Sequence, residues 1–169
     1  MCYKIDKMRN FFYNKSVVLG LIAFFMLISC STNKKEMKAL DLMSYGVPLK
    51  VKAPEGTKVE VKDMSIYKDI TLKDGKDYFV QIISTSATTN DISKIKEERL
   101  AEVKQNPFFH KVILDEKNGF VFEKQITDST FNYDFRYIKL QGDNQFTFQT
   151  GLFGLFTKYQ VLNMYNSVK

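Results

Sequence analysis

The stretch that decides the fold is Phe131-Asn132-Tyr133-Asp134-Phe135-Arg136-Tyr137-Ile138-Lys139-Leu140. Its aromatic residues recur at every second position, which is the spacing that places side chains on one face of a β-strand. After Tyr137 the apolar positions change face to Ile138 and Leu140. This switch indicates either a bulge near Tyr137 or a strand that is covered on both faces.

Period-two patterns on both sides of this stretch predict further antiparallel strands. The turn residues between them are Asp74-Gly75, Asn118-Gly119 and Gly142-Asp143, pairs that favour tight hairpins because they accept a positive φ. The expected strands cover residues 49–53, 59–61, 66–73, 77–85, 110–114, 119–126, 131–140 and 145–151.

Two longer helices are expected. One, capped by Thr89, Asn90 or Asp91, runs to about Gln105 with apolar residues on one face. The other starts at Thr157, where Thr157 and Gln160 form a capping box and Phe156 can act as a hydrophobic staple on Val161. A single helical turn is also expected over residues 38–43.

This order of elements predicts an α+β domain with a largely antiparallel sheet, a central helix and a C-terminal helix. The order, together with Tyr45-Gly46-Val47-Pro48 and Phe135-Arg136-Tyr137, resembles the PsbP-like α/β/α sandwich family over residues 46–169. The alternative is an open, helix-backed antiparallel sheet of another topology. Members of that family are mostly accessory or binding proteins, so the resemblance implies a binding role and carries no catalytic residue over to this chain.

Residues 1–29 have the pattern of an export signal. Lys4, Lys7, Arg9 and Lys15 precede an apolar run over residues 17–28, which is short for a membrane-spanning helix. The run ends in Leu27-Ile28-Ser29-Cys30, which resembles a bacterial lipobox. The resemblance implies cleavage by signal peptidase II and a lipidated Cys30 at the new N-terminus; an uncleaved N-terminal anchor is the alternative.

The expected organisation is a signal peptide over residues 1–29, a tether over 30–38 and one domain over 39–169. Ser31 and Thr32 follow Cys30, with no Asp of the kind that retains many lipoproteins in the inner membrane. We therefore expect an outer-membrane protein, and Lys34 and Lys35 favour its periplasmic face because surface-displayed lipoproteins of some groups carry an acidic run there.

Composition excludes several classes of protein. The net charge of +6 includes +3 from the signal, and the remaining charge mixes lysine and glutamate, so no nucleic-acid partner is expected. Cys2 leaves with the signal and Cys30 is blocked by lipid, so disulfides and thiolate catalysis are not expected. With 15 Phe, 9 Tyr and no Trp, the core should be rich in aromatic rings.

No constellation of residues indicates an enzyme. His110 is the only histidine, and we expect it to be a surface or hydrogen-bonded residue. The spacing of His, Cys and carboxylates fits no metal site, so neither a metal nor a cofactor is expected. Asp134 and Arg136 lie on the face of their strand opposite the aromatic residues, where an ion pair is the favoured interpretation and an arginine that grips a ligand is the alternative.

The segment Gly151-Leu152-Phe153-Gly154-Leu155-Phe156 carries no polar side chain although it connects two elements. We favour packing of Leu152, Phe153 and Phe156 under the last helix; the alternative is an exposed loop that docks a partner or dips into a membrane surface. The candidate partner or ligand contacts are Phe153, Leu155, Phe156, Tyr137 and Arg136.

These observations lead to two functional hypotheses. The first is a lipid-anchored, non-catalytic module in the periplasm that binds another envelope protein and contacts the membrane through Cys30. The second is a carrier of a small apolar ligand, held in a pocket between the aromatic strands and a helix.

Overall fold

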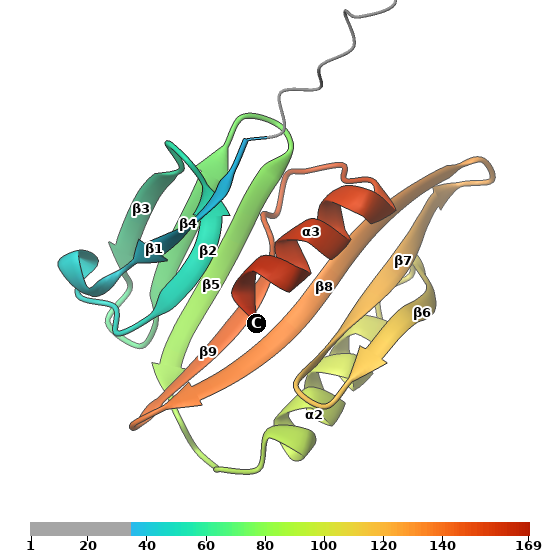
Figure 1. The fold of residues 1–169 in the computed structure, drawn as a ribbon. Coiled ribbons are helices and arrows are strands. Elements are labelled where there is room, and N and C mark those ends of the chain that lie inside the picture. The colour runs from blue at the N-terminus through green and yellow to red at the C-terminus, as the bar shows by residue number, and fades with distance from the viewer. Residues whose placement is uncertain (1–34) are drawn as a thin grey trace, which may run out of the picture. The chain divides into compact units, whose positions relative to one another are not determined.

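Within residues 35–169, which the computed structural model describes, seven strands form one antiparallel sheet (Figure 1). Its strand order is β3-β4-β5-β9-β8-β7-β6. The strands are β3 (Lys58–Asp63), β4 (Lys68–Asp74), β5 (Tyr78–Ser86), β6 (Phe109–Glu116), β7 (Gly119–Thr127), β8 (Thr130–Gln141) and β9 (Asn144–Thr150). The predicted α+β class with a largely antiparallel sheet is confirmed.

Two helices cover opposite faces of this sheet, α2 (Ile92–Lys104) and α3 (Lys158–Val168) (Figure 1). Asp91 caps α2 by accepting a hydrogen bond from the backbone N–H of Lys94 at 3.1 Å. Thr157 and Gln160 form the predicted capping box of α3. Both helices contact β8, so this strand is covered on both faces, and the register shifts lie in β6 and at the end of β7 rather than near Tyr137.

A second, two-stranded sheet pairs β1 (Met37–Asp41) with β2 (Lys50–Pro54). The short helix η2 (Met43–Tyr45) follows β1, so the helical turn expected over residues 38–43 is wrong for its first residues. The physical reason is that the backbone of this segment satisfies its hydrogen bonds against β2, while Met37 and Leu40 pack on the core. The compact unit that contains both sheets comprises Glu36–Lys169.

The main core lies between the sheet, α3 and the β1–β2 pair. The ring of Tyr165 on α3 makes edge contacts with Phe135 and Tyr137 of β8, at centroid distances of 5.7 and 5.8 Å. On the opposite face, Phe120 and Phe122 of β7 pack with Val103 of α2 in a second cluster. Val121, which lies between them in sequence, belongs to the main core, so the alternation of β7 supplies side chains to both layers.

Turn glycines follow the predicted chemistry at two hairpins. Gly75 and Gly142 have φ values of +58° and +57°, which L-residues with a side chain rarely adopt. Gly119 differs, because it has no positive φ. A Cβ at this position would meet the backbone of Arg136 and Tyr137, so Gly119 is needed for the close approach of β7 to β8.

The expected signal peptide, the lipobox and Cys30 lie outside the described residues. No helix in the part of the chain from residue 35 to 169 combines the length and apolarity needed to cross a membrane.

Candidate contact site

The connection between β9 and α3 exposes large apolar side chains to solvent. We call residues 151–156 the apolar loop. In it the exposed fraction is 71% for Leu152, 96% for Phe153 and 74% for Leu155. The expectation that Leu152 and Phe153 pack under the last helix is therefore wrong.

Phe156 behaves differently from its neighbours in the loop, because its side chain is only 3% exposed and belongs to the main core together with Val161. The predicted packing of Phe156 under α3 is confirmed. A residue buried to this degree has no surface left for a partner, so Phe156 anchors the loop instead of serving as one of its contacts.

The backbone of the loop is held by the side chain of Asn132, a buried residue of β8. Asn132 Oδ1 accepts a hydrogen bond from the backbone N–H of Phe156 at 2.8 Å, and Asn132 Nδ2 donates to the carbonyl of Gly154 at 3.1 Å. The backbone N–H of Tyr133 also donates to the carbonyl of Phe156 at 3.2 Å. The exposure of Leu152, Phe153 and Leu155 is thus a property of a backbone that is fixed to the sheet.

The two glycines of the loop are required by packing. A Cβ on Gly151 would overlap the ring of Phe79, and a Cβ on Gly154 would overlap the ring of Phe156. Neither glycine has a positive φ. The missing side chains of the two glycines allow two rings to lie against the loop backbone.

The apolar loop lies at the end of the domain where β1 begins, which we call the tether end (Figure 1). There the backbone N–H of Glu55 donates to the carbonyl of Glu36 at 3.1 Å. Nearby, the hydroxyl of Tyr78, at the start of β5, donates to the carbonyl of Lys52 at 3.1 Å. The backbone N–H of Gly151, the first residue of the loop, donates to the carbonyl of Phe79 in β5 at 2.9 Å. The start of the apolar loop therefore lies beside the start of β5.

Tyr137 and Arg136, the remaining candidate contacts, do not join the loop. Tyr137 packs against Tyr165 and Phe148 in the core. Arg136 pairs with Asp134 at 3.1 Å and lies over the ring of Phe122 at 5.5 Å, so the favoured ion-pair interpretation is confirmed.

Asp134 is a buried carboxylate in the middle of β8. It accepts hydrogen bonds from the backbone N–H and the hydroxyl of Thr150, at 3.1 and 2.6 Å, and pairs with Lys124 at 3.3 Å in addition to Arg136. Burial alone would raise the pKa of Asp134, but the charges of Arg136 and Lys124 and the two bonds from Thr150 outweigh it and lower the pKa. The network ties β8 to β9 directly before the apolar loop.

A second charged cluster was not expected from the sequence. Glu123 of β7 is buried; its Oε1 lies 2.7 Å from His110 Nδ1 and 3.3 Å from Lys111 Nζ, and its Oε2 accepts from the hydroxyl of Tyr133 at 2.8 Å. Burial alone would raise the pKa of Glu123, whereas bonds from His110, Tyr133 and Lys111 lower it. His110 is thus hydrogen-bonded, as expected. The sequence offered one indication that Glu123 is buried: it lies two positions after Val121, on the same inward face of β7.

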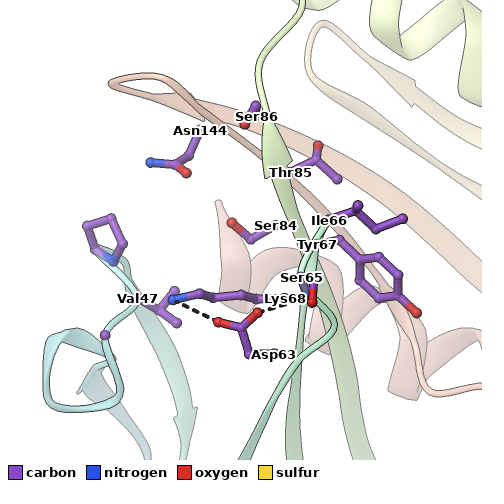
Figure 2. A pocket seen from close by; sticks show the side chains of 12 residues that line it. Val47, Asp63, Ser65, Ile66, Tyr67, Lys68, Ser84, Thr85, Ser86 and Asn144 are labelled. Atoms are coloured by element: carbon purple, nitrogen blue, oxygen red, sulfur yellow. Dashed lines mark hydrogen bonds and ion pairs between the residues drawn. The ribbon is translucent and has the colours of Figure 1, made fainter.

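The space between the aromatic strands and α3 holds packed rings instead of the pocket that a ligand carrier needs. A hollow of about 250 Å³ lies elsewhere, between the β3–β4 turn, the segment before β2 and the neighbouring ends of β5 and β9 (Figure 2). Its lining is mainly polar, with Asp63, Lys68, Ser84 and Asn144 among its residues. Asp63 pairs with Lys68 at 3.8 Å and accepts from the backbone N–H of Ser65, whose φ of +67° is unusual for a residue with a side chain.

Metal ligands do not gather in the part of the chain that is described. Among residues 35–169, no group of three or more His, Cys, Asp or Glu side chains could hold an ion. The chain matches no family model, and neither a curated protein nor a solved structure is significantly similar to it.

Proposed function

We propose that this chain is a lipid-anchored accessory module of the bacterial envelope, which acts by binding another component of the envelope and not by catalysis. The proposed anchor is Cys30, and the residues after it favour the outer membrane and its periplasmic face. The resemblance to the PsbP-like family supports a binding role, and an α+β domain with one helix on each face of the sheet is compatible with it.

The observation that carries the proposal is the exposure of Phe153, at 96%, in a loop whose backbone is held by Asn132. Exposed apolar surface on a monomeric domain commonly marks a site of contact with a protein or a membrane. Leu152 and Leu155 enlarge the same surface.

The ionisable groups that could support catalysis are engaged in structural networks. Glu123 receives bonds from His110 and Tyr133, and Asp134 bonds Thr150 and pairs with Arg136. Each network links neighbouring strands, which is a role in stability. These contacts favour binding over catalysis as the function of the domain.

The alternative, a carrier of a small apolar ligand, has less support. Such a ligand needs an enclosed apolar cavity, whereas Tyr165 fills the region between β8 and α3. Native mass spectrometry tests this alternative, since an apolar molecule that co-purifies with the chain would favour it.

The test of the main proposal is a crosslinking pull-down of the full lipidated protein from its native envelope, with Cys30→Ala as the control. A single stoichiometric envelope protein that is captured with the wild type and lost with Cys30→Ala would support an anchored interaction module. If neither sample captures a partner, the interaction-module proposal fails and the ligand carrier becomes the better explanation.

A further inference from the structure

The apolar loop presents leucine and phenylalanine side chains on a backbone that cannot easily withdraw them. Asn132 and the buried ring of Phe156 hold the loop in place, so Leu152, Phe153 and Leu155 stay in contact with water unless something covers them. Burial of such side chains is favourable in proportion to the apolar area removed from water. A partner with an apolar interior is therefore expected at this surface.

The position of the loop restricts which partner it meets first. The loop lies at the tether end, where the chain enters at Glu36. Cys30 is 36 − 30 = 6 residues away along the chain, and six residues span at most about 20 Å when fully extended. A lipid attached to Cys30 would hold Glu36 within this distance of the bilayer, and the apolar loop lies at the same end of the domain as Glu36.

We propose that Leu152, Phe153 and Leu155 insert into the surface of the bilayer in which Cys30 is anchored. This inference rests on the proposed lipid anchor, because it is the anchor that brings the loop to the membrane. Insertion of this kind reaches roughly 5–10 Å, to the boundary between headgroups and acyl chains. The anchor and the loop together would give the domain two contacts with the membrane and a defined orientation.

The surroundings of the loop suit a lipid surface. Residues 151–156 contain no charged side chain, and Lys158 in the first turn of α3 is exposed, where it can meet lipid phosphates. Phe131, which directly precedes Asn132 in β8, is also exposed.

The chain has no tryptophan, so a single introduced indole can report on the loop. The experiment uses full-length lipidated Phe153→Trp protein reconstituted into vesicles of phosphatidylethanolamine and phosphatidylglycerol, with and without bromine on the acyl chains. The matched control is Ile66→Trp, another highly exposed apolar position (83%), in the β3–β4 turn at the opposite end of the domain (Figure 1). We expect a blue-shifted emission and a loss of fluorescence in brominated vesicles for Phe153→Trp only.

A second variant keeps the test decisive. Adding Leu155→Asp to Phe153→Trp should restore the fluorescence lost in brominated vesicles, while circular dichroism shows an unchanged fold. Flotation of the protein together with the vesicles measures, in a separate experiment, whether the protein is anchored to the membrane. Protein that fails to float refutes the anchor and, with it, the insertion.

Protein that floats but is not quenched at Phe153→Trp overturns only the insertion. If, in addition, Phe153→Asp abolishes a crosslinked complex in the native envelope, the occupant of the loop is a protein.

Discussion

Asn132 Oδ1 accepts a hydrogen bond from the backbone N–H of Phe156 across 24 residues of sequence, at 2.8 Å. This bond joins the start of β8 to the segment that leads into α3. The bond fixes the backbone at the end of the apolar loop. The side chain of Phe156 there is buried in the core, whereas that of Phe153, three residues earlier, is exposed to solvent. The contact surface and the stability of the domain therefore depend on the same buried amide.

Asn132→Ala should destabilise the domain by about 1–3 kcal/mol, because it leaves the buried N–H of Phe156 and the carbonyl of Gly154 without their partner. Urea unfolding followed by circular dichroism measures the loss. Asn90→Ala, at an exposed position before α2, should change the free energy of unfolding by less than about 0.5 kcal/mol. Equal effects of the two substitutions would mean that Asn132 does not hold the loop.

Phe156→Ala and Phe153→Ala form a matched pair within one loop. Phe156→Ala should cost about 3–5 kcal/mol, since it opens a cavity in the main core. Phe153→Ala should stay within about 0.5 kcal/mol, because its side chain makes little contact with the domain. A large destabilisation by Phe153→Ala in the same unfolding measurement would show that this ring is part of the core.

Gly154→Ala should destabilise the domain by about 1–3 kcal/mol, because the added methyl group overlaps the ring of Phe156. The smaller side chain in Phe156→Leu should relieve the overlap, so the double variant should lose less than the sum of the two single losses. Additive losses in thermal or urea unfolding would contradict the direct contact between Gly154 and the ring.

The buried carboxylate of Asp134 should make stability depend on pH on the acid side. Its pKa is lowered in the folded state relative to the ordinary value of 3.8. The unfolded chain therefore takes up the proton first, so the stabilising contribution is present above about pH 4 and is lost as the pH falls through the folded pKa.

Urea unfolding of the wild type and of Asp134→Asn between pH 7 and pH 3 tests this dependence. The variant should lack the part of the acid-side slope that Asp134 contributes. It should also be less stable at pH 7, because Arg136 and Lys124 lose the negatively charged carboxylate with which both of them pair. A slope identical to that of the wild type would exclude Asp134 as a source of acid sensitivity.

The hairpins and helices could be predicted because their signals are local. Asp74-Gly75 marks a hairpin since its glycine adopts a positive φ, and Thr157 with Gln160 marks a helix start since the two residues satisfy each other's backbone donors. The change of face at Ile138 left two possibilities, a bulge near Tyr137 or a strand covered on both faces, and the contacts of α2 and α3 with β8 show that the second is correct. Each of these properties depends on residues a few positions apart.

The charged network around Glu123 could not be predicted in the same way. Glu123 meets His110 from the neighbouring strand and Tyr133 from the strand on its other side. Which side chains face each other across strands depends on register, and the shifts within β6 move that register by amounts that no local pattern shows.

The sequence by itself determined the class of the fold, the strand and helix positions from residue 50 onward, and the apolar character of the loop before α3. Only the tertiary structure decided which of the apolar side chains in that loop are buried. A run of apolar residues in a connection has no periodicity that separates an inner face from an outer one. Asn132, which lies in β8, fixes the loop backbone through its bond to Phe156. Phe156 then packs beneath α3, and Leu152, Phe153 and Leu155 remain exposed.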